Sequence, residues 1–76
     1  MTPDMKRALG VVYALGDRAP RIGEVRALLG LPVGDVFDER LAWFVKGVQA
    51  RVGLPVSGWL TQATLDAIDK VKGVAR

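Results

Sequence analysis

Asp38-Glu-Arg-Leu-Ala-Trp-Phe-Val-Lys-Gly-Val-Gln-Ala-Arg-Val52 reads as one helix, and the same tetrapeptide, Gly-Leu-Pro-Val, lies on either side of it at 30–33 and 53–56. Residues 25–47 can be placed over residues 48–70 without a gap, and the two tetrapeptides then coincide. The chain therefore contains an internal repeat with a period of 23 residues, the difference between positions 53 and 30.

Each copy of the repeat carries the signals of one helix that ends and another that begins. A glycine followed by a proline-containing turn stops a helix, and Asp or Thr is a favoured residue for capping the start of the next. Apolar positions and caps coincide between the copies: Phe37 falls on Leu60, Val45 on Ile68, and Asp38 on Thr61. The central helix therefore closes the first copy and opens the second.

Three shorter helices are predicted around the central one. The first runs from Thr2 to about Leu15, because Pro3 suits a first helical turn and apolar residues then recur at helical spacing. Residues 21–29 form the second helix and residues 62–71 the last. All four are expected to bury one apolar face each.

The residues of these faces follow from the helical period of about 3.6 residues. The N-terminal helix is expected to bury a stripe formed by Met5, Ala8, Leu9, Val12 and Gly16. The core is expected to contain Ile22, Val25, Leu28 and Leu29, then Leu41, Phe44, Val45, Val48 and Val52, and finally Leu65, Ile68 and Val71. Two extended pieces, 33–37 and 56–60, are too short to be predicted as strands.

The sequence thus predicts an all-α fold, a small helical bundle that forms a single domain over residues 1–76. Residues 1–20 supply an N-terminal helix and a turn, and residues 21–71 supply the core that contains the repeat. A chain of 76 residues has room for one hydrophobic core and little else.

The composition argues against catalysis and metal binding. The chain has no histidine and no cysteine, which removes the commonest general base and the best zinc ligands. Two of the three clustered acids, Asp38 and Glu39 beside Asp35, have simpler roles as a helix cap and as compensation of a helix dipole. We therefore predict no enzyme activity, no catalytic residue, no metal and no cofactor.

From about residue 25 to residue 68 the chain resembles the three-helix peptidoglycan-binding domain found on bacterial and phage cell-wall hydrolases. The residues at the family's spacing are Phe37, Val45, Gln49, Gly53, Leu54, Val56, Gly58 and Thr64, and the family's Asp-Gly pairs appear as Gly34-Asp35 and Ser57-Gly58. The chain departs from the family's pattern at Asp38, Leu41, Phe44, Val48 and Thr61. The resemblance implies a non-catalytic module that binds peptidoglycan, through its glycan or its stem peptide, near the turns. The candidate ligand-binding residues are Trp59, Ser57, Gly58, Asp35 and Gln49.

Each of the prominent side chains also has a purely structural interpretation. Trp43, with Gly47 and Ala50 on the same helix face, is either a protein interface or a surface covered by the N-terminal helix. Trp59 is either a stacking platform for a sugar or another protein, or a lid over the end of the bundle. Gln49 either contacts the ligand or turns inward to satisfy the backbone of a loop.

A second function is expected from the same features. Wall-binding modules of this family usually accompany a hydrolase, whereas this chain carries none before Arg76. The alternative is therefore a structural or decorating protein of a phage virion that uses the fold for protein–protein contacts. No secretion signal is visible after Met1, and the net charge of +3 is spread without a run. We expect a virion or cell-wall location, otherwise a cytoplasmic one, with no nucleic-acid or membrane partner.

Overall fold

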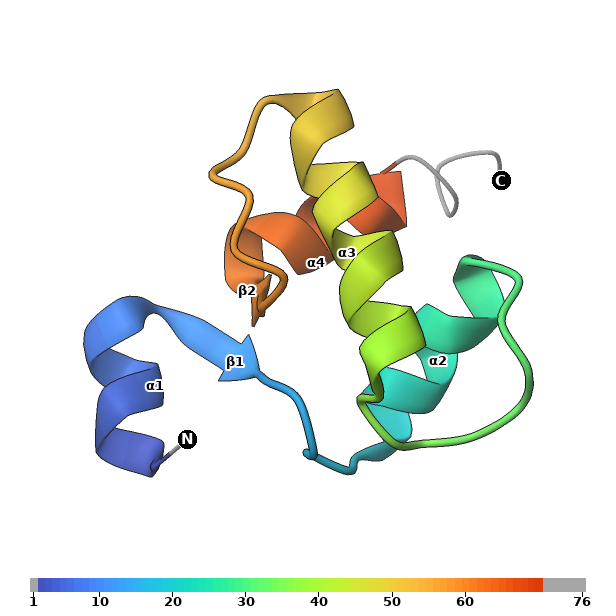
Figure 1. The fold of residues 1–76 in the computed structure, drawn as a ribbon, viewed down its shortest axis with the longest axis horizontal. Coiled ribbons are helices and arrows are strands. Elements are labelled where there is room, and N and C mark those ends of the chain that lie inside the picture. The colour runs from blue at the N-terminus through green and yellow to red at the C-terminus, as the bar shows by residue number, and fades with distance from the viewer. Residues whose placement is uncertain (1, 71–76) are drawn as a thin grey trace.

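The computed structural model describes residues 2–70, which form four α-helices and a two-stranded antiparallel sheet (Figure 1). In chain order the elements are α1 (Pro3–Leu9), β1 (Val11–Tyr13), α2 (Pro20–Leu28), α3 (Glu39–Val52), β2 (Leu60–Thr61) and α4 (Gln62–Ile68). The prediction of an all-α fold is therefore wrong, because the fold combines helices with a small sheet.

The N-terminal segment is where the prediction failed. Helix α1 ends at Gly10, which takes a left-handed conformation with φ of 70° and donates its N–H to the end of the helix. The Val-Val-Tyr run that follows suits a strand, and it pairs as β1 with β2. No residue of α1 is buried, and both Met5 and Leu9 are 51% exposed, so the expected buried stripe does not exist.

Residues 11–19 form an extended segment that pairs with the ends of the two loops of the repeat, the loop before α3 and the loop before α4. Strand β1 pairs with β2, while Gly16 donates to the Phe37 carbonyl at 2.8 Å and Phe37 donates to the Asp17 carbonyl at 2.8 Å. An antiparallel bridge between Arg18 and Val36 continues this second pairing. Each of the two extended pieces of the repeat thus pairs with the N-terminal segment, and the two pieces do not pair with each other.

The helices of the repeat begin within one residue of their predicted starts, but α4 ends at Ile68, short of the predicted residue 71. Asp38 caps α3 by accepting the N–H of Leu41, and Thr61 caps α4 by accepting the N–H of Thr64. The buried core comprises Ile22, Val25, Phe37, Leu41, Val45, Leu60, Leu65 and Ile68. Val71, which was also placed in the core, lies outside the described residues.

Two predicted core residues of α3 are largely at the surface. Phe44 and Val52 are each 39% exposed. The buried stripe of α3 runs through Leu41, Val45 and Gln49, and Phe44 lies about 100° from its centre at 100° per residue. Val52 points in the right direction, but it is the last residue of the helix and extends past the core.

The two Gly-Leu-Pro-Val turns share a left-handed glycine and one backbone hydrogen bond, as expected for two copies of a repeat. Gly30 and Gly53 have positive φ angles of 77° and 82°. The next residue in each turn then donates to the carbonyl five residues before it, from Leu31 to Arg26 at 2.8 Å and from Leu54 to Gln49 at 2.9 Å.

Candidate functional site

Helix α3 crosses the middle of the molecule (Figure 1), and its Trp43 is exposed to solvent. Trp43 is 74% exposed, and α1 packs beside β1 at the far end of the molecule. The interpretation that the N-terminal helix covers Trp43 is therefore wrong. An exposed tryptophan on a rigid helix is a strong candidate for a contact with a ligand or partner.

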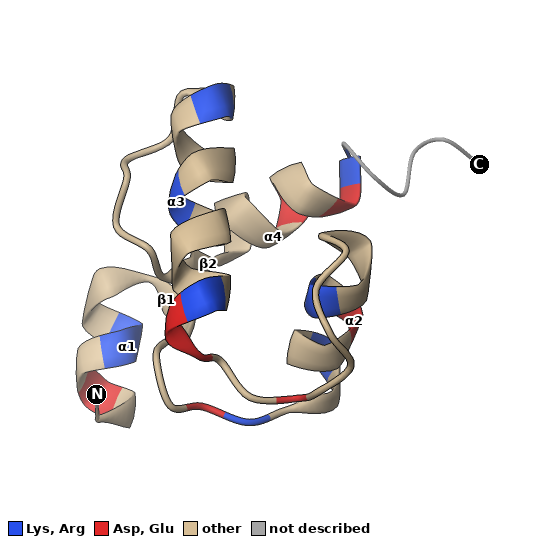
Figure 2. Ribbon diagram, turned by 45° about the vertical axis from the view of Figure 1, so that its right-hand side comes forward, with Lys and Arg blue, Asp and Glu red and all other residues tan. Residues whose placement is uncertain are grey.

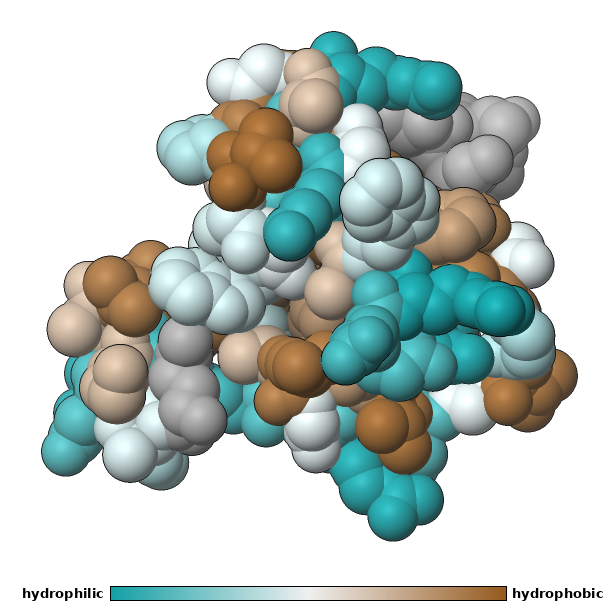
Figure 3. All heavy atoms as spheres, in the orientation of Figure 1, coloured by the Kyte–Doolittle hydropathy of each residue, from teal (hydrophilic) through white to brown (hydrophobic). Residues whose placement is uncertain are grey.

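Trp43 separates two hollows. The first, which we call the apolar groove, has a volume of about 350 Å³ and is lined by Leu29, Trp43, Phe44, Gly47, Val48, Arg51, Val52 and Ile68. Gly47, a predicted interface residue, belongs to this lining, whereas Ala50 is exposed and lines neither hollow. Figure 3 shows paler and more hydrophobic side chains over the face of α3, with hydrophilic side chains on either side of them.

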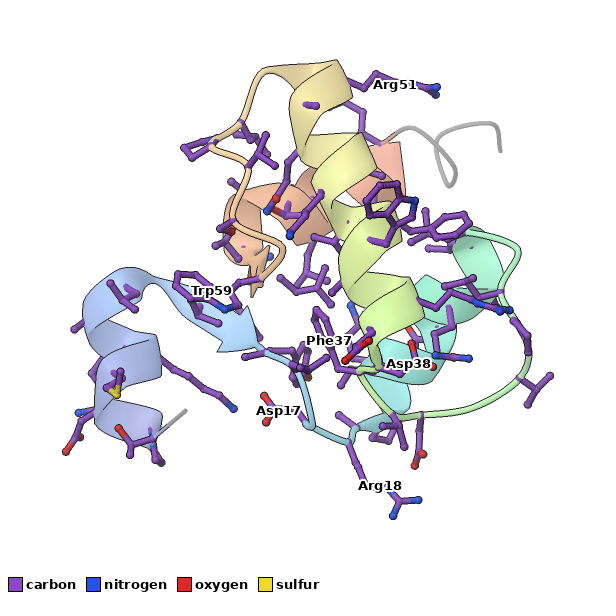
Figure 4. All side chains as sticks on the ribbon, viewed as in Figure 1. Asp17, Arg18, Phe37, Asp38, Arg51 and Trp59 are labelled. Carbon is purple, nitrogen blue, oxygen red and sulfur yellow. The ribbon has the colours of Figure 1, made fainter. Side chains whose placement is uncertain are left out.

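The second hollow, which we call the aromatic groove, has both tryptophans in its lining. It has a volume of about 270 Å³ and is lined by Leu15, Phe37, Glu39, Ala42, Trp43, Lys46, Ser57, Gly58 and Trp59. Figure 4 shows Trp59 on the loop before β2 and Phe37 on the loop before α3. Trp43 and Trp59 were predicted to belong to separate sites, so the groove that they share is not visible in the sequence.

Charged and polar groups line the same groove as the tryptophans. Glu39 and Lys46 line the aromatic groove from α3, and Ser57 lines it from the loop. The stem of Lys46 lies against Gly58, where a β-carbon would come within 3.0 Å of the Lys46 Cε atom. Gly58 thus makes room for the Lys46 side chain, which has a place in the site that its surface position did not predict.

Gln49 fixes the loop that carries Trp59. It is 1% exposed, its Oε1 accepts the N–H of Ser57 at 2.9 Å and of Gly58 at 3.0 Å, and its Nε2 donates to the Trp59 carbonyl at 2.9 Å. The same Nε2 lies 3.1 Å from the Thr64 hydroxyl. The inward interpretation of Gln49 is confirmed, and its amide group is fully used inside the protein.

Arg26 holds the first loop in the same way, although no role was predicted for it. It is buried, its Nε donates to the Pro32 carbonyl at 3.0 Å, and its Nη1 donates to the Val36 carbonyl at 3.2 Å and pairs with Asp38 at 3.0 Å. Arg26 lies 23 positions before Gln49, one repeat period. The 23-residue repeat is the sequence signal that identifies Arg26 as the counterpart of Gln49.

The remaining predicted ligand residue lies elsewhere. Asp35 is exposed, pairs with Arg18 at 3.6 Å, and lines a third hollow that includes Gly34 but neither tryptophan. Of the predicted ligand residues, Trp59, Ser57 and Gly58 line the aromatic groove together, and Gln49 supports them from below.

Two carboxyl groups have pKa values below the ordinary value of 3.8. The pKa of Asp38 is lowered first by the hydrogen bond from the Leu41 N–H and then by Arg26. Burial on its own would raise the pKa of Asp17, but hydrogen bonds from Lys6 and from the Ala14 N–H more than offset it and lower the pKa. Both charged carboxylates therefore stabilise the fold.

We expect the protein to lose stability in acid. A group whose pKa is lowered by folding contributes stability above its unfolded pKa, near 3.8, and loses it as the pH falls through the folded value. These two groups should therefore change the urea concentration at the unfolding midpoint little between about pH 7 and pH 5. At pH values below about 4, the midpoint should decrease. The double variant Asp17→Asn with Asp38→Asn should start lower at pH 7 and decline less in acid. An acid decline as steep as that of the wild type contradicts this assignment.

Two further kinds of site are not found between residues 2 and 70. No group of three or more acidic side chains is arranged to hold a metal ion. No helix in this range has the length and apolar content needed to cross a bilayer.

Comparison with known proteins yields no match, whether to a protein-family model, to a curated protein or to a solved structure. The resemblance to peptidoglycan-binding domains therefore depends on the sequence positions alone.

Proposed function

We propose that this chain is a non-catalytic module that recognises bacterial cell-wall peptidoglycan in the aromatic groove. The observation that carries the proposal is that one groove has both Trp43 and Trp59 in its lining, together with Glu39, Lys46 and Ser57. A pyranose ring has an apolar face of C–H groups and a polar edge of hydroxyl and acetamido groups. Aromatic faces beside a few polar groups are what such a ring requires.

The polar groups of the groove match that edge. Glu39 supplies an acceptor, Lys46 supplies donors, and the Ser57 hydroxyl retains its hydrogen because its oxygen accepts from the Trp59 N–H. The Lys46 ammonium also suits the carboxylate groups that peptidoglycan carries on its sugars and peptides. The groove thus has a partner for each kind of group on the polymer.

The loop that carries Trp59 is held in place before any ligand arrives. Gln49 binds three consecutive residues of the loop, Ser57, Gly58 and Trp59. A binding surface that is already ordered loses less conformational entropy when it binds. Gln49 therefore supports binding as a positioning residue and does not touch the ligand.

Retention on purified cell-wall sacculi tests this proposal. The wild-type chain should sediment with the sacculi, and Trp43→Ala or Trp59→Ala should each weaken retention about 30-fold, the effect of losing about 2 kcal/mol at an aromatic hot spot. Phe44→Ala is the matched control, because Phe44 lines the apolar groove and does not line the aromatic groove. Circular dichroism confirms that each variant is folded. If the wild type is not retained, or if Phe44→Ala is as damaging as the tryptophan variants, the proposal fails.

A second proposed function is a protein–protein interaction module, such as a structural or decorating subunit of a phage virion. It is favoured by the apolar groove, which leaves Trp43, Phe44 and Val52 in contact with water although it could bury them against another chain. Interface hot spots are enriched in tryptophan and arginine, and Arg51 lines this groove beside Trp43.

A further inference from the structure

Lysine and arginine residues lie along the length of α3 (Figure 2), and they form no ion pair with the described residues. Every lysine and arginine between residues 2 and 26 lies within 4.0 Å of a carboxylate: Lys6, Arg7, Arg18, Arg21 and Arg26. In the rest of the described chain, Arg40, Lys46 and Arg51 of α3 have no such partner, and neither does Lys70. The ion pairs within the described chain therefore leave the cations of α3 available to bind acidic groups of a partner.

Two of these cations bracket the exposed apolar residues of α3. Arg40 precedes Trp43 and Phe44 by three and four residues, and Arg51 follows Phe44 by seven, so all lie on one side of the helix. Figure 4 shows Arg51 pointing outward at the end of α3. Arg40 and Arg51 are separated by 11 residues, which corresponds to about 16 Å along a helix.

We propose that the apolar groove binds an acidic amphipathic helix of a partner protein, which deepens the second proposed function and rests on it. The apolar side chains of the partner helix would enter the groove against Phe44, Val48 and Leu29. Acidic residues about three turns apart on that helix would meet Arg40 and Arg51. Helices that place an apolar face in a groove in this way are a recurring mode of recognition.

The charge and lining of the groove select this partner over the alternatives. The exposed apolar helix of a second copy, α1, carries Lys6 and Arg7 against Asp4, so its positive charge does not complement the charge on α3. A single-stranded nucleic acid would use stacking surfaces and several phosphate contacts. The groove offers Trp43 and Phe44 for stacking, but half of its lining is aliphatic, namely Leu29, Val48, Val52 and Ile68, which favours the apolar face of a helix.

Three synthetic helical peptides test the inference by isothermal titration calorimetry with the full chain. Each is a stapled 14-residue helix with the same leucine face, and the flanking positions carry Glu, Gln or Lys. The Glu peptide should bind at least about tenfold more tightly than the Lys peptide at low salt, from one to two exposed ion pairs. Arg40→Glu with Arg51→Glu should reverse this order. Phe44→Ala should weaken binding of the Glu peptide about 30-fold, whereas Trp59→Ala should leave it unchanged.

The outcomes separate the inference from the function on which it rests. If the Gln peptide binds as tightly as the Glu peptide, the groove is a protein-docking site but the partner is not acidic, and the inference is wrong. If none of the peptides binds, both the inference and the second proposed function lose their support. Tighter binding of a 14-nucleotide oligothymidylate that depends on the same arginines, or a concentration-dependent dimer in sedimentation velocity that Phe44→Ala abolishes, also overturns it.

Discussion

Replacing Gln49 with leucine is expected to lower the free energy of unfolding by about 3–5 kcal/mol, because it leaves several polar groups of one loop without partners. The N–H groups of Ser57 and Gly58 and the carbonyl of Trp59 each lose a hydrogen bond to the Gln49 amide. A buried polar group without a partner costs about 1–3 kcal/mol. A domain of this size has a total stability of about 4–11 kcal/mol, so the loss is a large part of it.

Thermal unfolding followed by circular dichroism measures this effect. A shift of 4–8 °C for each kcal/mol predicts that Tm falls by roughly 12 °C or more. Gln62→Leu is the matched control, since Gln62 is exposed on α4 and bonds only Asp66. Gln49→Glu separates the two halves of the amide, because a carboxylate still accepts from the loop N–H groups but cannot donate to the Trp59 carbonyl. Equal Tm values for Gln49→Leu and Gln62→Leu would show that the loop does not depend on the amide.

The parts of the fold that sequence predicted are those encoded by neighbouring residues. Asp38 and Thr61 cap the helices that follow them, and the glycines of the two tetrapeptides end the helices before them. Each of these signals acts within about five residues, so it is visible in a single sequence.

The sheet was missed because its two strands lie far apart in the sequence. Val11 pairs with Thr61, 50 positions away, the difference between 61 and 11. The spacing of Met5, Leu9 and Val12 fits a helix as well, and the period alone does not show that Gly10 ends it. A strand of three residues has no local pattern strong enough to reveal its partner.

The candidate site was predicted in pieces. Trp59, Ser57 and Gly58 were identified together because they adjoin one another in the sequence. Trp43 joins them only through the rotation of α3 about its axis relative to the loop, which depends on how the whole core packs. Arg26 is a different case, because the alignment of the two copies already placed it opposite Gln49.

Replacing Arg26 with leucine is expected to lower the free energy of unfolding by about 2–3 kcal/mol. The change leaves the Pro32 and Val36 carbonyls without their donor and removes the ion pair with Asp38. Most of the loss should come from the carbonyls, because the side chain of Asp38 is 45% exposed and water can hydrate its charge. Arg26→Gln, which introduces the residue of the second repeat copy, should lose less, since an amide can still donate to one carbonyl.

The acid profile distinguishes this role of Arg26 from a general loss of packing. Arg26 is the second cause of the lowered pKa of Asp38, so Arg26→Leu should raise that pKa toward its ordinary value and flatten the decline of stability below about pH 4. Arg40→Leu is the control, because Arg40 is an exposed arginine and has no acidic partner among the described residues. Urea unfolding at pH 7 and pH 3 measures both effects. If Arg26→Leu unfolds at the same urea concentration as Arg40→Leu at pH 7, the buried arginine does not brace the first loop, and the two copies of the repeat differ in the way they are held.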